Sequence, residues 1–261
     1  MAEHEFTKLA LLYSPTDRAR KAARELCERI DFVPIEEADC VVSLGGDGSM
    51  LDALHDMLDT GRILPVYGLN LGTVGFLMNR WHGANRLQEH INKAKKMSIA
   101  PLQMTATTQA GETKSYYAIN EVSLLRETRQ TAKIEISVNE KVRIPELVGD
   151  GVLLSTPVGS TAYNLSANGP ILPLGSQMLA LTPISPFRPR RWSGAILPES
   201  MRVTFRINEP AKRPVAVVAD QKEVRDVAEV NVVIARDMEM CLLFDPGQAL
   251  DERIVSEQFA H

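Results

Sequence analysis

A glycine-rich loop with one carboxylate inside it is the first feature of this chain that could carry out chemistry. The loop has the sequence LGGDGS over residues 44–49, after an apolar segment and before a stretch with helical spacing. Glycines let the backbone approach a ligand closely, and the amides at the start of a helix offer hydrogen-bond donors to a phosphate. The loop is therefore suited to an anion. A plain tight turn between a strand and a helix is the alternative.

Asp47 inside this loop argues against the plain turn. A carboxylate repels phosphates, so it needs another purpose there, either accepting a proton from an attacking hydroxyl or holding ribose hydroxyls and a metal. The loop is not a Walker A sequence, because no Gly-Lys-Ser/Thr ending follows, and it is not GxGxxG. Loops of this kind occur in several kinases that lack a P-loop.

A second glycine-rich turn, LNLGTVGFL over residues 69–77, also follows an apolar segment. Two such turns at the carboxyl ends of adjacent parallel strands would face the same crevice, which is where open α/β sheets bind ligands. A loop without any ligand is the alternative.

Two polar clusters stand out in the second half of the chain. Asn120 and Glu121 follow apolar residues within an expected strand, where a solvated strand end is the alternative. Residues 149–170, GDGVLLSTPVGSTAYNLSANGP, combine hydroxyls and glycines with a single tyrosine. Ser160 and Thr161 are suited to cap a helix up to Ala167, and Tyr163 could stack on an aromatic ring. A capped helix with a packed tyrosine is the alternative.

The elements that must position these residues follow from periodicity. Apolar runs predict three strands, helical spacing predicts a helix before and after the second strand, and Gly61 ends the later helix. This alternation is typical of a parallel, Rossmann-like α/β sheet. The expected strands are 8–13, 40–44 and 64–69, with the first helix at 18–30.

From about residue 97 onward, short β-branched and apolar segments predict an all-β domain of antiparallel strands. We therefore expect an α/β domain over residues 1–97 and an all-β domain over 98–244. The end of the chain, about 245–261, is expected to return to the first domain, with a short helix at 250–259. The expected strands are 103–109, 116–125, 133–138, 151–155, 203–207, 215–219, 230–235 and 240–244.

Composition limits the classes of function. The chain has 261 residues, of which 44% are hydrophobic, and a formal net charge of −4. A negative charge argues against a nucleic-acid partner, and we expect no membrane segment and no signal peptide. Cys27, Cys40 and Cys241 form neither a disulfide framework nor a zinc motif. A reducing cytoplasm is the expected location.

With these motifs in order, the sequence resembles the NAD kinase family of ATP- or polyphosphate-dependent enzymes. The resemblance rests on LGGDGS, LNLGTVGFL, Asn120-Glu121, GDG at 149–151 and STPVGSTAYNLSANGPI at 155–171. It implies phosphoryl transfer to the 2′-hydroxyl of the adenosine ribose of NAD, with ATP and a divalent cation, Mg²⁺ being expected. It also implies an α/β domain joined to an all-β domain, and assembly as a homodimer or homotetramer.

The resemblance also implies roles for individual residues. Asp47 would be the proton acceptor. The phosphate donor would lie on Gly45, Gly46, Gly48 and Ser49, where many members have Thr in place of Ser49. NAD would contact Asp47, Gly48, Phe76, Asn120, Glu121, Asp150, Thr161, Ala162, Tyr163, Asn164, Leu165 and Ser166. No residue is assigned as a metal ligand.

Two places depart from the family pattern or stay open. The family often has Asp-Gly-Gln where this chain has Asp220-Gln221 without the glycine, so these residues receive no role from the resemblance. Arg190 and Arg191 could meet phosphates or a neighbouring subunit, or be solvated surface arginines.

A lipid kinase with a GGDG loop and a non-catalytic dinucleotide sensor are the rival functions. NADH as acceptor, polyphosphate as donor and feedback by NADP(H) are not determined by the sequence.

Overall fold

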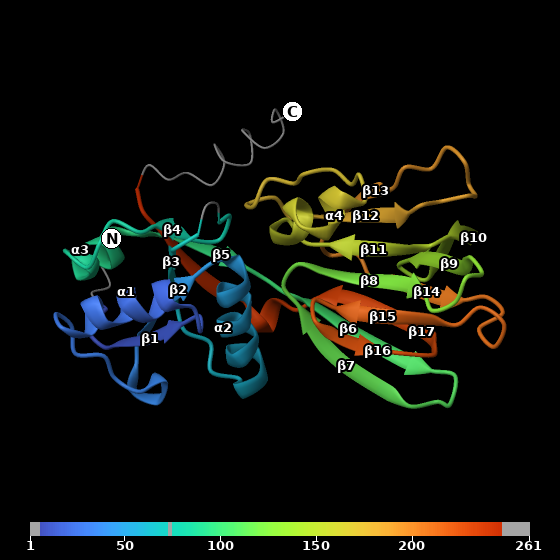
Figure 1. Cartoon of the computed structure of the whole chain (residues 1–261). Helices are drawn as coiled ribbons and strands as arrows, with labels where there is room; N and C mark the ends of the chain where they lie inside the picture. The colour runs from blue at the N-terminus through green and yellow to red at the C-terminus, as the bar shows by residue number, and fades with distance from the viewer. Residues whose placement is uncertain (1–5, 73–74, 247–261) are drawn as a thin grey trace. The chain divides into compact units, whose positions relative to one another are not determined.

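The computed structural model describes residues 6–72 and 75–246, which form two compact units (Figure 1). The first unit contains the described residues up to Ile99 together with those from Met238 onward. The second unit is Ala100–Asp237. The chain thus leaves the first unit once and returns to it.

The first unit is built on a mixed, mostly parallel sheet with strand order β1-β2-β3-β18-β5, in which β4 also pairs with β3. Strands β1, β2 and β3 are parallel, β18 is parallel to β3, and β5 is antiparallel to β18. The bounds are β1 Leu9–Tyr13, β2 Cys40–Gly45, β3 Val66–Asn70, β4 Asn79–Arg80, β5 Lys95–Ile99 and β18 Met240–Phe244. The predicted α/β class is confirmed.

Helices cover this sheet. The helices are α1 Asp17–Cys27, α2 Asp47–Thr60 and α3 Leu87–Lys93, with a 3₁₀ helix at Ile35–Glu37. The Thr16 hydroxyl accepts a hydrogen bond from the Ala19 amide and so starts α1. Leu26 of α1 is fully buried in one cluster with Val42 and Leu44, and such a side chain stabilises the fold by about 2 kcal/mol. Helix α2 ends at Gly61, whose φ of 71° is left-handed.

Strand β18 corrects one expectation from the sequence. Met240–Phe244 was expected to continue the all-β domain, but it lies in the first sheet between β3 and β5. Four of its five residues are buried, as suits an inner strand of a covered sheet. A short apolar run predicts a strand but does not specify its sheet. The helix expected at 250–259 lies outside the described residues.

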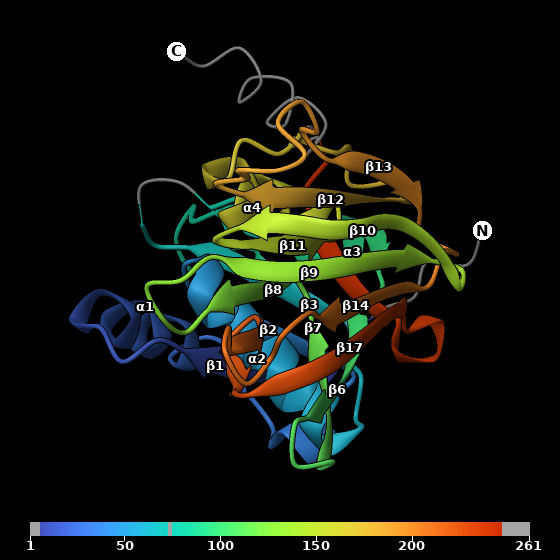
Figure 2. The same ribbon diagram turned by 90° about the vertical axis from the view of Figure 1, so that its right-hand side faces the viewer.

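The second unit is a sandwich of two six-stranded antiparallel sheets. One sheet has the order β10-β9-β14-β17-β6-β7, of which Figure 2 shows the first five strands side by side, and the other has the order β13-β12-β11-β8-β15-β16. The predicted all-β class is confirmed. The strands are β6 Leu102–Thr108, β7 Thr113–Ala118, β8 Glu121–Arg126, β9 Ala132–Val138, β10 Lys141–Gly149, β11 Gly151–Ser155, β12 Met178–Ile184, β13 Ala195–Pro198, β14 Val203–Ile207, β15 Val215–Ala219, β16 Lys222–Val224 and β17 Val227–Ile234.

The core of this unit lies between the two sheets. Ile134 and Phe205 of one sheet share a fully buried cluster with Leu124 and Leu154 of the other. Every residue of β11 is buried, because the segment after β11 folds back over this strand. That segment contains a 3₁₀ helix, Val158–Thr161, and the short helix α4, Tyr163–Ser166. A further 3₁₀ helix, Arg236–Met238, follows β17.

The expected strand over 116–125 is two strands. Strand β7 ends at Ala118 in one sheet, and β8 begins at Glu121 in the other. Ile119 and Asn120 form the crossing between the sheets. The sequence had suggested that Asn120 lies in a strand, and this expectation is wrong.

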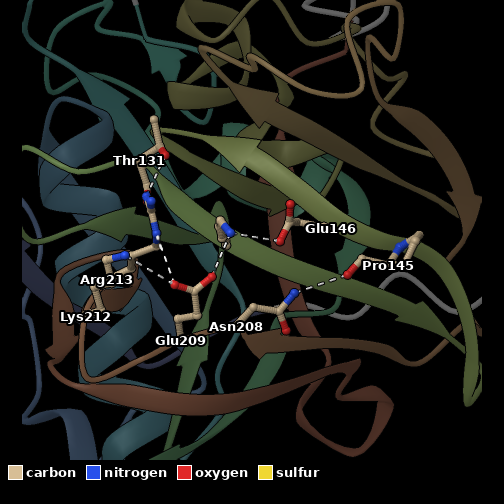
Figure 3. A network of polar contacts seen from close by, with 8 residues as sticks. Thr131, Pro145, Glu146, Asn208, Glu209, Lys212 and Arg213 are labelled. Atoms are coloured by element: carbon tan, nitrogen blue, oxygen red, sulfur yellow. Dashed lines mark hydrogen bonds and ion pairs between the residues drawn. The ribbon is translucent and has the colours of Figure 1, made fainter.

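A surface network ties β9 and β10 to the loop after β14 (Figure 3). Glu209 accepts a hydrogen bond from Lys133 at 2.7 Å and also faces Arg213 at 3.9 Å. Lys133 reaches Glu146 at 3.3 Å, and Arg213 donates to the Thr131 carbonyl at 2.6 Å. The hydrogen bond to Glu209 raises the pKa of Lys133. Such exposed pairs are screened by solvent, so this network fixes a loop more than it stabilises the fold.

Among the described residues, no helix is long and apolar enough to cross a membrane.

Candidate active site

Asp47 is the first residue of α2 and follows the strand β2 after one residue, Gly46. Its side chain is half-buried, and its two oxygens accept hydrogen bonds from the backbone amides of the second glycine-rich turn. The Phe76 amide donates to one oxygen at 2.7 Å and the Leu77 amide donates to the other at 3.0 Å. The two glycine-rich segments that the sequence singled out therefore meet at this carboxylate.

Gly75 makes this meeting possible by close approach. A Cβ atom at Gly75 would lie 3.1 Å from Asp47 Oδ1 and 3.2 Å from the Asn70 side-chain amide. The Asn70 side chain in turn accepts a hydrogen bond from the Gly72 amide at 2.7 Å and shapes the start of the turn. Residues 73 and 74 of this turn lie outside the described residues.

The surroundings of Asp47 suit both phosphate binding and proton transfer. Gly45 is the last residue of β2, Gly46 is the N-cap of α2, and Gly48 and Ser49 lie in the first turn. The first amides of a helix have no partner within the helix, so they are available to an anion. Each oxygen of a carboxylate has two lone pairs. With one amide bound to each, Asp47 keeps a fixed orientation and can still accept a hydroxyl proton.

In the second unit, Glu121, Tyr163 and Asp150 share one electrostatic environment. Burial, and then the charge of Asp220, raise the pKa of Glu121 to about 7. Burial, and then the charges of Glu121 and Asp150, raise the pKa of Tyr163. The Glu121 Oε2 atom is buried without a hydrogen-bond partner. Such an atom normally has a partner, so this oxygen is available to a ligand that brings a donor.

The polar segment after β11 packs directly on the Asn120 crossing. The Thr156 hydroxyl donates to the Ile119 carbonyl at 2.7 Å, and the Gly159 amide donates to the Thr156 hydroxyl at 3.1 Å. A Cβ atom at Gly159 would lie 2.2 Å from the Asn120 carbonyl oxygen. Two polar clusters that are distant in sequence are therefore in contact.

The helix in this segment differs from the expectation. It covers only Tyr163–Ser166, and no side chain caps it. The Ser160 hydroxyl instead donates to the Pro157 carbonyl at 2.7 Å and accepts from the Leu172 amide at 3.0 Å. Ala162, with φ −95° and ψ −124°, separates the helix from the preceding 3₁₀ turn.

Asn164 holds the segment together from inside. It is fully buried, and its side chain donates to the Pro170 carbonyl at 2.8 Å and accepts from the Thr182 hydroxyl at 2.7 Å. The polar atoms of its side chain thus have hydrogen-bond partners within the protein, which indicates a structural role for this side chain rather than contact with a ligand. The other candidates of this segment are half-buried or exposed, namely Thr161, Ala162, Tyr163, Leu165 and Ser166.

Asp150 lies between β10 and β11 and pairs with Arg126 at 2.6 Å. Its side chain is half-buried, so part of the carboxylate remains accessible. Arg190 is an exposed residue that lies over the Phe187 ring at 5.8 Å. Arg191 is exposed as well. Within the part of the chain that the structure describes, no hydrogen bond or ion pair joins either arginine to Asp47, Glu121 or Asp150.

Asp220 is the residue that sequence reasoning left without a role. It accepts hydrogen bonds from the amides of Ile119, Asn120 and Glu121. The only signal in the sequence is an aspartate directly after a strand, which is common in turns. The residues that donate these amides cannot be recognised from the sequence, because every residue except proline has a backbone N–H group.

The raised pKa of Glu121 predicts how its charge affects stability. The folded state holds this proton more tightly than the unfolded state between the ordinary pKa of 4.5 and about 7. The stabilising contribution is therefore fully present below pH 4.5 and is lost as the pH rises through about 7. The variant Glu121→Gln lacks this titration. We expect its melting temperature, compared with wild type by calorimetry, to gain more at pH 8 than at pH 5; an equal difference at both pH values would contradict a buried, titrating Glu121.

No group of three or more His, Cys, Asp or Glu side chains that could hold a metal ion lies together in residues 6–72 and 75–246. Magnesium is usually bound through one or two carboxylates together with substrate phosphates. A cation carried by a nucleoside triphosphate would need no cage of protein ligands.

Comparisons with known proteins match both parts of the chain to NAD kinases. Residues 1–96 match the model of the ATP-NAD kinase N-terminal domain, and residues 119–244 match that of the ATP-NAD kinase C-terminal domain. The chain is 56% identical over 255 residues to the NAD kinase of Zymomonas mobilis, covering 98% of both chains. It is 59% identical over 253 residues to the NAD kinase of Rhizorhabdus wittichii, covering 97% of this chain and 98% of the relative.

Solved structures show the same fold at lower identity. The yeast NADH kinase complexed with NADH superposes with a TM-score of 0.80 at 20% identity, covering 99% of this chain and 89% of the other. An NAD kinase from Archaeoglobus fulgidus in complex with ATP gives a TM-score of 0.75 at 21% identity, covering 96% and 98%. On the full-length identity to curated relatives and the matches of both domains, the chain belongs to the NAD kinase family.

Proposed function

We propose that this protein phosphorylates NAD to NADP with ATP, the reaction named by its family, and that the acceptor is the 2′-hydroxyl of the adenosine ribose. One observation carries the catalytic part of the proposal. Asp47 stands at the start of α2, beside amides suited to phosphate, and two backbone amides fix its carboxylate. That arrangement supplies a held base next to a phosphate-binding helix start.

In the proposed reaction the ribose oxygen attacks the γ-phosphorus of ATP. The new bond forms between that oxygen and phosphorus, the bond from phosphorus to the bridging oxygen breaks, and ADP leaves with its electron pair. Asp47 accepts the hydroxyl proton. Phosphoryl transfer depends mainly on positioning and on neutralising charge, so the protein needs no covalent nucleophile. A positioned base contributes about 10²- to 10⁴-fold to such a step.

The remaining candidates bind the substrates in this proposal. Amides of the loop that contains Gly45, Gly46, Gly48 and Ser49 bind the phosphates of ATP. Asn120 and the unpaired oxygen of Glu121 accept hydrogen bonds from NAD or donate hydrogen bonds to it. NAD also contacts Gly48, Phe76, Asp150, Thr161, Ala162, Tyr163, Leu165 and Ser166. Asn164 supports this segment from within.

A divalent cation, Mg²⁺ being the expected one, accompanies ATP and neutralises charge on the triphosphate when bound. We further propose a homodimer or homotetramer in the reducing cytoplasm. These points rest on the resemblance to the family and on three cysteines that are all free in the structure.

The test is NADP formation from NAD with ATP and Mg²⁺, followed by a coupled NADP-specific dehydrogenase. NADP is expected, and its formation should depend on both ATP and the cation. Repeating the assay with polyphosphate in place of ATP shows whether the enzyme also accepts this phosphate donor. Tight NAD binding without product from any donor would favour a dinucleotide sensor instead. Failure to bind NAD, with phosphorylation of a lipid alcohol, would favour a lipid kinase.

A further inference from the structure

Asp220 makes an unusual set of contacts at the crossing between the two sheets of the second unit. Its Oδ2 atom accepts from the Ile119 amide at 2.6 Å, and its Oδ1 atom accepts from the amides of Asn120 at 3.0 Å and Glu121 at 3.1 Å. The Asp220 amide in turn donates to the Glu121 carbonyl at 3.2 Å. Four hydrogen bonds therefore join this one residue to three consecutive residues of the crossing.

The geometry of the crossing explains why a carboxylate is needed. Strand β7 ends at Ala118 in one sheet and β8 begins at Glu121 in the other, so the amides between them leave one ladder before the next is complete. Buried amides without partners are strongly disfavoured. One carboxylate has enough acceptor sites for all three, and hydrogen bonds to a charged acceptor are stronger than those to a neutral one.

Asp220 is placed for this by its own strand. Ala219, the last residue of β15, pairs with Val122 of β8. The chain then turns at Asp220, whose φ of 51° is left-handed, a conformation that aspartate tolerates better than most residues. The turn brings its carboxylate back over the amides that precede β8.

The crossing carries two residues of the proposed NAD site. The backbone orientation at Asn120 and Glu121 sets where their side chains lie, and Gly159 of the other polar segment packs on the Asn120 carbonyl. We propose that Asp220 is a positioning residue of this enzyme, which fixes Asn120 and Glu121 for NAD through their backbone amides and keeps a negative charge beside Glu121. The inference rests on the proposed NAD site.

The charge gives this role a distinct signature. The charged group that raises the pKa of Glu121 is Asp220, from the turn between β15 and β16. Glu121 and Asp150 in turn raise the pKa of Tyr163 of α4. Removing the charge of Asp220 removes one of the two causes that raise the pKa of Glu121, while burial remains. The pH dependence of NAD binding should therefore move toward lower pH when Asp220 is neutralised. A purely structural defect would not move it in that direction.

The test compares Asp220→Asn with Asp226→Asn. Asp226 also lies in a turn of this unit with a left-handed φ of 53°, and it is exposed. The Asn side chain keeps one acceptor oxygen but presents an NH₂ group to an amide. We expect the KM for NAD of Asp220→Asn to rise about tenfold, the KM for ATP to stay within about twofold of wild type, and the pH profile of kcat/KM for NAD to shift to lower pH. Asp226→Asn should match wild type in all three.

Two outcomes would overturn the proposal. An unchanged KM for NAD would mean that Asp220 does not position the site. Equal increases of both KM values together with a lower melting temperature, and no shift of the pH profile, would mean a general structural role. If Asp220→Asn does not fold, Asp220→Glu takes its place: this variant keeps the charge but moves the acceptors, so its KM for NAD should rise while its pH profile stays that of wild type, and an unchanged KM for NAD would overturn the proposal. NADP formation by wild type is measured first, so failure of the proposed function would be seen independently.

Discussion

Replacing Asp47 by Asn is expected to lower kcat for NADP formation by about three orders of magnitude while the protein stays folded. The amide cannot accept the ribose proton, so the variant loses the base but keeps the shape of the side chain. One amide of the Phe76–Leu77 pair would face the new NH₂ group, at a local cost of about 1 kcal/mol. The side chain is only half-buried, and the fold tolerates this cost.

The matched control for this variant is Asp56→Asn, an exposed aspartate of the same helix. It should keep the kcat of wild type. Steady-state kinetics, NAD titration and a melting curve on all three proteins separate the possibilities. Wild-type turnover in Asp47→Asn would show that Asp47 is not the base. A loss of turnover matched by a loss of folded protein would show that the contact with the glycine-rich turn is structural alone.

Replacing Gly159 by Ala is expected to lower the free energy of unfolding by about 3 kcal/mol and to raise the KM for NAD. The new Cβ atom would lie 2.2, 2.4 and 2.6 Å from the oxygen, carbonyl carbon and Cα of Asn120. All three are backbone atoms, so no change of rotamer relieves the clash. Either the segment after β11 or the Asn120 crossing must move, and both carry residues of the proposed NAD site.

Gly175→Ala provides the control, because a Cβ atom at Gly175 meets nothing within 4 Å. Urea unfolding and NAD kinetics should leave this control close to wild type. If Gly159→Ala has the same stability and the same KM for NAD as Gly175→Ala, the two polar segments are not packed as described. A raised KM for NAD with the KM for ATP unchanged would localise the damage to the NAD site.

Several parts of the molecule could be predicted from sequence because they depend on neighbours along the chain. The parallel α/β unit followed from helical spacing between apolar runs, and the limits of β2, β11, β14 and β15 lie within about one residue of those expected. The GGDGS loop and the STPVGSTAYNLS segment identified the family. Glycine, periodicity and capping are local signals, so they survive without knowledge of the fold.

Other parts were decided by the tertiary structure. The strand Met240–Phe244 was expected in the wrong sheet, since an apolar run does not specify its partner. The break between β7 and β8 and the burial of Asn164 also had no local signal.

The contacts that organise the candidate site show most clearly what only the tertiary structure decided. The amides of Phe76 and Leu77 hold Asp47 from 29 and 30 residues away, and Asp220 reaches the crossing at residues 119–121 from 99 to 101 residues away. The sequence determined which side chains are candidates for phosphoryl transfer to NAD. The fold determined which of them are oriented, because the groups that orient them are backbone amides, which every residue except proline provides and which only strand order and chain crossing bring into place.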